Sequence, residues 1–400
     1  MDEQPWNRQR LRSNNEWLLL EHLRNAAPAS RAQLARVTGL SKPTVSSALA
    51  ALEQRGLVRE AGTALPERGR TAVLYEPDPT AGYVLGIDIG RARLRAAVAD
   101  LSGEVLSRID VPNTGRTAAA LADAAARAAG KVMDSADVSA DRVVHAAVGT
   151  PGVFDPEDGR VRYAVNLPGW GRAGLFDKVR EQLGGSALEL SVHNDANLAA
   201  LGEYAFGAGR GSKLFVYVLI GTGLGIGIVS HGELFTGAHG AAGEVGFLPL
   251  SLGSPELLRH GPRRGALEEA VSADAVVRTA RELGMTGRLT AKRIFDEARA
   301  GTPAAVAAVR QESERLALVV AAVSAVLDPD LVVLGGGVGR STDLLLAPVR
   351  AALHQTTPLR PALAPSELGD NAVLLGAIAT ALRSARPRVF NLPTNQTHAS

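Results

Sequence analysis

Two long stretches of the chain follow the same order of elements, and this repetition constrains the fold more than any other feature. In the first, apolar runs broken by glycine at 83–111 precede an Ala-rich helical run at 117–134 and a further strand at 142–152. In the second, a similar run at 213–235 precedes helical segments, the strand DLVVLGGGVG and a last helix, NAVLLGAIATALRS. Alternating strands and helices are typical of α/β domains, and two such units place a cleft between them. We therefore predict two α/β lobes.

Three glycine-rich turns follow predicted strands, at 88–93, 220–227 and 334–339. Such turns bring backbone N–H groups close to phosphate groups. A single glycine turn indicates no more than a tight bend, but three turns in this order form a specific set. The candidate phosphate-contacting residues are Asp88, Gly90, Gly221, Thr222, Gly223, Gly335 and Gly336.

The segment HNDANLAALGE (193–203) places Asn194 and Asp195 between a predicted strand and a predicted helix. Three roles are open for Asp195. As a general base it would accept a hydroxyl proton. As a binding residue it would hold a ligand, together with Asn194. As a helix cap it would bind backbone N–H groups of the helix that begins at Ala196.

The N-terminal segment has the spacing of a helix-turn-helix. After a predicted helix at 7–26, Ser30 is placed to cap a second helix that ends at Gly39. Ser41 is placed to cap a third helix, which runs to Gly56. Two short helices joined by a tight turn that contains glycine are the signature of this motif. The two strand-like runs that follow, around a polar loop, predict a wing.

Small polar and basic side chains mark the surface that this motif would present to DNA. Small hydrogen-bonding residues on the third helix allow it to enter the major groove, and arginines at the wing tip suit phosphates or a narrow minor groove. Basic residues outnumber acidic ones in 6–70, although the whole chain has 43 Lys and Arg against 41 Asp and Glu. The candidate DNA-binding residues are Arg31, Ser41, Lys42, Thr44, Ser46, Ser47, Arg68 and Arg70.

Composition and patterning divide the chain. We predict a DNA-binding domain at 1–76, a linker rich in Pro and Gly at 77–83, a two-lobed domain at 84–385 and a flexible tail at 386–400. No apolar run approaches the ~20 residues that a membrane-spanning helix needs, and the polar N-terminus lacks the apolar core of a signal peptide. Without cysteine, neither a disulfide nor a thiolate-bound metal can form. We expect a cytoplasmic protein with no membrane partner.

Together these motifs resemble the ROK family (repressors, open reading frames, kinases), which has the hexokinase/actin-like ATPase fold. The resemblance covers about residues 83–385 and rests on Asp88-Ile89-Gly90, Gly149-Thr150-Pro151-Gly152, Asn166 and Trp170 in NLPGW, HNDANLAALGE, GTGLGIGIV, GELFTGAHGAAGEVG and LVVLGGG. The repressor branch of the family carries a winged helix that its sugar kinases lack. The predicted fold is therefore an N-terminal winged helix-turn-helix followed by a two-lobed α/β ROK domain.

The first glycine turn departs from the pattern of the family's kinases. Those kinases read Asp-x-Gly-Gly-Thr, whereas this chain reads Asp88-Ile89-Gly90-Arg91-Ala92. Arg91 replaces a glycine that permits close backbone approach, and Ala92 replaces a threonine hydroxyl, although Arg91 could itself touch a phosphate. The resemblance therefore implies a vestigial ATP site and no catalytic residue. Asp195 would then bind a ligand.

The resemblance also implies a sugar site, but not the zinc site of the family. That zinc site uses one His and three Cys; here Phe247 stands at the histidine position and the chain has no cysteine, so His239 and His260 do not make a metal site. The missing histidine also contacts a sugar hydroxyl in the family, so we expect a different specificity. Arg263 and Arg264 would favour an anionic ligand such as a sugar phosphate, and this alternative stays open. The candidate effector-binding residues are Asn166, Asn194, Asp195, Glu244, Phe247 and Glu268.

We predict a DNA-binding transcriptional regulator, expected to repress carbohydrate-metabolism genes under the control of a small sugar or sugar-phosphate effector. Its partners would be double-stranded operator DNA, the effector and further copies of the chain in a homodimer or homotetramer, because a palindromic operator matches two-fold protein symmetry. We expect no cofactor and no metal. Two alternatives stay open: a sugar kinase that also binds DNA, and a DNA-binding scaffold that responds to no ligand.

Overall fold

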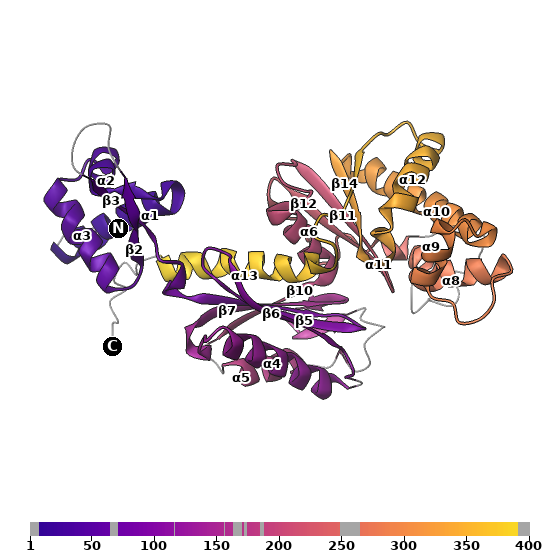
Figure 1. The fold of residues 1–400 in the computed structure, drawn as a ribbon, viewed down its shortest axis with the longest axis horizontal. Helices are drawn as coiled ribbons and strands as arrows, with labels where there is room; N and C mark the ends of the chain where they lie inside the picture. Colours follow the sequence, from indigo (N-terminus) through magenta and orange to yellow (C-terminus); the bar gives the residue numbers. More distant parts are fainter. Residues whose placement is uncertain are drawn as a thin grey trace.

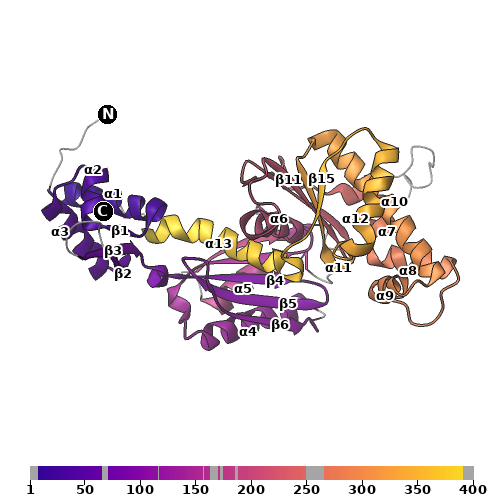
Figure 2. The ribbon, with the colours of Figure 1, turned by 45° about the horizontal axis from the view of Figure 1, so that its top comes forward.

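The computed structural model describes residues 8–64, 71–115, 117–155, 157–162, 170–171, 174–184, 188–248 and 265–390. Figure 1 shows three bodies in a row: an N-terminal helical domain, a first α/β lobe in the middle and a second α/β lobe at the far end. Helix α13 (Ala372–Phe390) runs from the junction of the lobes toward the N-terminal domain, as Figure 2 shows from another side. None of the described helices has the length and apolar character needed to cross a membrane.

The N-terminal domain is a winged helix, as predicted. It contains α1 (Arg8–Ala26), α2 (Arg31–Thr38), α3 (Lys42–Gln54), β1 (Ala29–Ser30), β2 (Val58–Ala64) and β3 (Ala72–Pro77), with the strands in the order β1-β3-β2. Ser30 and Gln33 form a capping box, in which each side chain accepts a hydrogen bond from the backbone N–H of the other residue. Gly39 ends α2 with a φ of 70°, a left-handed conformation that favours glycine.

The first lobe is built on a five-stranded sheet in the order β10-β7-β4-β5-β6. Strands β4 (Tyr83–Ile89), β5 (Arg93–Asp100) and β6 (Val105–Pro112) are antiparallel neighbours, while β7 (Val143–Thr150) and β10 (Glu189–Asn194) extend the sheet in parallel. Helices α4 (Ala118–Ser135) and α5 (Leu175–Leu183) lie on one face and α13 on the other (Figure 1). A small hairpin of β8 (Val153–Asp155) and β9 (Arg160–Arg162) follows β7.

The second lobe repeats this topology with the strand order β13-β12-β11-β14-β15. Its strands are β11 (Leu214–Ile220), β12 (Leu224–Ser230), β13 (Glu233–Leu234), β14 (Leu331–Gly335) and β15 (Ala362–Pro365). Its helices are α7 (Ala266–Val271), α8 (Ala273–Glu282), α9 (Ala291–Arg299), α10 (Pro303–Leu327), α11 (Gly336–Gly339) and α12 (Thr342–Thr356). Both lobes therefore join three antiparallel strands to two parallel strands, in agreement with the repeated sequence pattern.

Helices α6 (Asp195–Phe206) and α13 pack against each other between the lobes. Helix α6 lies against β11 and β12 of the second lobe, and α13 lies against β4 and β7 of the first. The two backbones approach most closely at Gly202 and Gly376, where a Cβ atom on Gly376 would stand 1.7 Å from the Leu198 carbonyl oxygen. Beside this crossing, the Glu203 carboxylate accepts hydrogen bonds from the Ser366 hydroxyl and from backbone N–H groups at 367–368. The two helices thus join the lobes at a closely packed contact.

Helix α13 is longer than the sequence analysis predicts. It continues to Phe390, so residues 386–390 are helical and the predicted tail at 386–400 begins too early; residues 391–400 lie outside the described part of the chain. Tertiary contacts account for the difference despite Pro387. The Phe390 side chain is buried, and the Arg386 guanidinium donates to the carbonyl oxygens of Leu101 (2.9 Å) and Ser102 (3.0 Å).

The segment predicted as a linker at 77–83 is also structured. Pro77 ends β3, a 3-10 turn spans Pro79–Ala81, and Tyr83 begins β4. Asp78 caps the turn and donates its N–H to the Leu57 carbonyl oxygen at 2.9 Å. Apolar residues of the winged helix, the first lobe and α13 form one contiguous core. This core attaches the winged helix to the first lobe.

Glu312 is a buried acid in the second lobe, on α10. Among the described residues neither of its carboxylate oxygens has a hydrogen-bond partner, and the Arg315 guanidinium lies 3.9 Å away. Burial raises the pKa of Glu312 from 4.5 to about 8, against the opposing charge of Arg315. Between about pH 4.5 and pH 8, Glu312 is therefore protonated in the folded state and ionised in the unfolded state. The protein loses stability as the pH rises through this range, because folding then requires the uptake of a proton.

We expect Glu312→Gln to remove this pH dependence. Between about pH 5 and pH 8 the wild type should lose stability relative to the variant, by at most about 1.4 kcal/mol per pH unit. Thermal unfolding across this range measures the difference. Glu314→Gln, at an exposed position on the same helix, serves as the matched control and should follow the wild type. Parallel profiles for wild type and Glu312→Gln would show that Glu312 does not titrate in this range.

Candidate effector cleft and nucleic-acid interface

A cavity of about 260 Å³ lies between the two lobes. Among its lining residues are Asp88, Gly90, Asn194, Asp195, Gly221, Thr222, Gly223, Glu244, Phe247, Glu268 and Gly336, all of them candidates from the sequence. Gly335 does not line the cavity; it packs on Tyr217, whose hydroxyl oxygen would stand 1.9 Å from a Cβ atom at that position. The volume is below the roughly 300–1,000 Å³ of pockets for drug-sized ligands. The cavity therefore suits one small molecule.

Asn194, and not Asp195, caps helix α6. The Asn194 side-chain oxygen accepts a hydrogen bond from the Asn197 N–H at 3.1 Å, and its side-chain nitrogen donates to the Gly152 carbonyl oxygen at 3.1 Å. Both Asn and Asp are favoured caps, and the end of β10 places Asn194 at this position. The cap position, which the sequence leaves open for Asp195, is therefore taken by Asn194. The two side-chain contacts of Asn194 hold the start of α6 against the turn after β7.

Asp195 is the first residue of α6 and lines the cavity. One carboxylate oxygen accepts a hydrogen bond from the Ala196 N–H at 2.8 Å. Burial, together with the nearby charges of Asp88 and Glu244, raises the pKa of Asp195 to about 7. A carboxyl group in this position can accept hydrogen bonds from ligand hydroxyl groups.

Two further carboxylates come from the second lobe. Glu244 precedes a 3-10 turn at Val245–Phe247, and burial followed by the charge of Glu268 raises the pKa of Glu244. Glu268 lies on α7, and its carboxylate accepts a hydrogen bond from the Leu224 N–H at 3.2 Å. A Cβ atom on Gly223 would stand 2.8 Å from the same carboxylate. Glu268 therefore lines the cavity and holds the second glycine turn in place through its contacts with Gly223 and Leu224.

Of the two remaining effector-binding candidates, Phe247 lines the cavity, whereas Asn166 lies outside the described residues. The Phe247 ring lines the cavity and is 47% exposed, so the mouth of the cavity has an apolar edge. Asn166 lies outside the described residues, as do His260, Arg263 and Arg264. Trp170, from the same motif as Asn166, is buried, and its indole N–H donates to the Thr150 hydroxyl. Within the described ranges, no group of three or more His, Asp or Glu residues is arranged to hold a metal ion.

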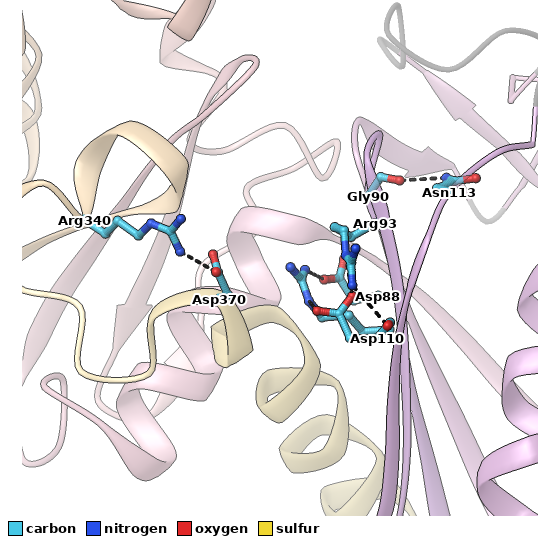
Figure 3. Close-up of polar contacts among 8 residues, drawn as sticks. Asp88, Gly90, Arg93, Asp110, Asn113, Arg340 and Asp370 are labelled. Carbon is cyan, nitrogen blue, oxygen red and sulfur yellow. Dashed lines mark hydrogen bonds and ion pairs between the residues drawn. The ribbon is translucent and has the colours of Figure 1, made fainter. Parts of the chain in front are cut away.

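The first glycine turn carries an ion-pair network. Strand pairing places Asp88 of β4 opposite Arg95 of β5, and Arg95 opposite Asp110 of β6. The Arg95 guanidinium lies 2.8 Å from the Asp88 carboxylate and 3.2 Å from Asp110, and Arg93 lies 2.7 Å from Asp110 (Figure 3). Burial raises the pKa of Asp88 to about 6, although Arg95 lowers it. The turn itself is held by Asn113, which donates to the Gly90 carbonyl oxygen at 2.7 Å.

Polar cavity residues that the sequence did not point to include Arg95, Tyr217 and Asp370. Asp370 lies just before α13 and forms an ion pair with Arg340, which follows the third glycine turn (Figure 3). A signal existed for Arg95, because a basic residue inside an otherwise apolar strand needs a partner. No signal existed for Asp370, whose surroundings in the sequence are those of an ordinary polar turn.

Several predicted DNA-binding residues have local partners. The Ser41 hydroxyl caps α3 by accepting from the Thr44 N–H and lies 2.8 Å from the Thr44 hydroxyl. The Arg31 guanidinium donates to the Tyr75 hydroxyl and stacks 5.1 Å from the centre of its ring. Arg68 and Arg70 lie outside the described residues. Lys42 and Ser47 are exposed on α3, and Ser46 is half-buried.

The outward face of α3 has a composition that the sequence analysis did not single out. Val45, Leu49 and Leu52 are buried in the domain core. The opposite side of the helix presents Pro43, Ser47, Ala50 and Gln54, all of them exposed. This row has the 3.6-residue spacing of one helix face. It is the surface that a winged helix would place in the major groove.

Family models match both parts of this architecture. The model of the MarR family matches residues 12–69, which include α2, α3 and most of α1. The model of the ROK family matches residues 84–384, which include both lobes. The chain belongs to the ROK family. The predicted fold class of this ROK protein, a winged helix followed by a two-lobed α/β domain, is thereby confirmed.

Relatives of this ROK protein include both kinases and repressors. It is 32% identical over 283 residues to the glucokinase of Halalkalibacterium halodurans, covering 67% of this chain and 84% of the glucokinase. It is 28% identical over 387 residues to the xylose repressor of Caldicellulosiruptor bescii, covering 92% of this chain and 95% of the repressor. The crystal structure of a ROK family transcriptional regulator, a homolog of the E. coli MLC protein, has a TM-score of 0.73 at 22% identity, covering 96% of this chain and 100% of that one. The likeness to regulators therefore includes the winged helix.

Proposed function

We propose that this ROK protein is a transcriptional repressor of carbohydrate-metabolism genes whose affinity for operator DNA depends on a small sugar-like effector. The observation that carries the proposal is the presence of a winged helix and a carboxylate-lined cleft in one chain, with similarity to a xylose repressor over both. Since its operator would be chromosomal DNA, we infer that it acts in the cytoplasm.

The cleft chemistry favours a polyol. Asp195, Glu244 and Glu268 bring hydrogen-bond acceptors to one small cavity from both sides of the cleft. Hydroxyl groups of a sugar are donors that such acceptors satisfy, and a charged acceptor makes a stronger hydrogen bond than a neutral one. Arg91 and Arg95 also line the cavity, so a phosphorylated sugar is a second ligand that the test below includes.

The first glycine turn argues against a sugar kinase. Phosphoryl transfer from ATP needs metal ions and backbone N–H groups around the phosphates. Here Arg95 already pairs with the Asp88 carboxylate, and the bulky Arg91 occupies the turn. We therefore assign Asp88 to an internal ion pair, Asp195 to effector binding and no residue to catalysis.

Helix α13 offers a physical link between the effector and DNA. Ala372 and Val373 at its start line the cavity, while Phe390 at its end belongs to the core that the winged helix shares. An effector that prefers one arrangement of the lobes would shift the population toward it. In a homodimer or homotetramer this shift would change the spacing of the two recognition helices, and so the affinity for a palindromic operator.

The test is thermal unfolding against a panel of sugars and sugar phosphates, each with and without Mg-ATP. A bound ligand raises the Tm by mass action. We expect a shift with one sugar class alone and no release of ADP. A shift with ATP alone, or sugar-dependent ADP release, would support the kinase instead. A panel without any shift would favour a scaffold that responds to no ligand.

A further inference from the structure

The exposed row Pro43–Ser47–Ala50–Gln54 on α3, here called the reading face, carries a specific chemistry. Its first three side chains are small, so the helix can approach the floor of the major groove closely. The Pro43 ring and the Ala50 methyl group are apolar, and the Ser47 hydroxyl both donates and accepts. The reading face has neither a guanidinium group nor a carboxylate.

Each base pair offers a different edge to such a face. Guanine is read mainly by Arg or Lys and the amino group of cytosine by Asp or Glu, whereas the thymine methyl group is read by apolar contact and adenine by Asn or Gln. Pro43 and Ala50 match the methyl group of thymine, and the Gln54 amide matches the N6 and N7 atoms of adenine. The Ser47 hydroxyl accommodates either base.

Three arginines in the described part of the domain are held by partners away from the reading face. Arg55, at the end of α3, pairs with Glu16 at 3.2 Å, and Arg59 of β2 pairs with Glu76 at 2.8 Å. Arg31 is held against Tyr75. Lys42 is exposed in the first turn of α3, on the flank of the helix and near its N-terminus, where a phosphate group is favourable. Of these four residues, Lys42 is the one placed to contact the DNA backbone, and base recognition is left to the reading face.

We propose that α3 recognises thymine methyl groups, so that each operator half-site is specified mainly by A·T pairs. The inference rests on the proposed function, because it requires the winged helix to bind an operator. It assigns Pro43 and Ala50 as specificity-determining residues, beside the hydroxyl-bearing residues of the same helix that the sequence predicts.

The first experiment is selection of binding sites from random duplex DNA with the full chain, followed by thymine-to-uracil replacement in the selected site. Uracil lacks the C5 methyl group and keeps every hydrogen-bonding group. We expect half-sites in which A·T pairs are specified, and a loss of about fourfold in affinity for each contacted methyl group removed. Half-sites specified by G·C pairs, or full affinity for the uracil duplexes, would overturn the inference while leaving the DNA-binding function intact. Failure to select any sequence would overturn both.

A matched pair of variants assigns the contact to the reading face. Ala50→Gly should make the site insensitive to uracil at one position, because the methyl group on the protein side is gone. Ala51→Gly makes the same change in helix propensity at the next residue, which lies off the reading face and is half-buried. It should keep the uracil effect in full. Equal uracil sensitivity in both variants would show that Ala50 does not contact a thymine methyl group.

Discussion

Replacing Asp195 with alanine is expected to abolish the response to the effector while leaving operator affinity unchanged. Asp195 lines the cavity, and the hydrogen bond from the Ala196 N–H is made to one of its two carboxylate oxygens. Loss of hydrogen bonds from ligand hydroxyl groups to this carboxylate should weaken effector binding by about 10- to 100-fold. The winged helix lies at the other end of the first lobe, away from the cavity (Figure 1). Fluorescence anisotropy of labelled operator DNA, with and without effector, measures both quantities.

Two controls separate this role from a structural one. Asp177→Ala removes a carboxylate from the surface of α5, where it pairs only with Arg180 in the next turn at 3.2 Å among its described contacts, and it should respond to the effector like the wild type. Thermal unfolding without ligand should show Asp195→Ala folded. A variant that still responds to the effector would remove Asp195 from the binding site. A variant that no longer binds operator DNA without effector would instead assign it to the packing of the lobes.

Local sequence signals predicted the helix boundaries of the winged helix well. Ser30, Gly39 and Ser41 act where they were expected to act, because capping depends on residues only a few positions apart. The same kind of signal failed at HNDAN, where Asn194 and Asp195 are adjacent and both are good caps. The end of β10 decides between them, and that strand end is set by pairing with β7. Local chemistry therefore predicted that a cap exists, and tertiary pairing selected the residue.

The partners of charged residues could not be predicted in this way. Asp88, Arg95 and Asp110 meet because three strands align in one register. That register depends on how the whole hairpin packs, and the sequence shows only three charges on separate strands. The predicted carboxylates and all of the predicted glycines except Gly335 line the cavity, while their roles in effector binding stay predictions. The site prediction missed Arg95 because the function of this arginine depends on what lies opposite.

The crossing of α6 and α13 leads to the largest expected loss of stability. Gly376→Ala would place a Cβ atom 1.7 Å from the Leu198 carbonyl oxygen and 3.0 Å from the Gly202 nitrogen. These are backbone atoms inside a helix, so the clash can be relieved only by separating α6 from α13. We expect a loss of about 3 kcal/mol or more in the free energy of unfolding, and a fall in Tm on the order of 10 °C. Thermal and urea unfolding measure both.

Gly130→Ala provides the opposite case for the same substitution. Gly130 lies inside α4, and a Cβ atom there would meet no described atom within 4 Å. Alanine should therefore stabilise the protein by about 0.5–1 kcal/mol, because glycine loses more conformational freedom in a helix.

Since α13 connects the cleft to the winged helix, the Gly376 variant should also lose effector-dependent control under conditions in which it remains folded. If Gly376→Ala unfolds like Gly130→Ala and keeps that control, the two helices do not transmit the effector signal through this contact.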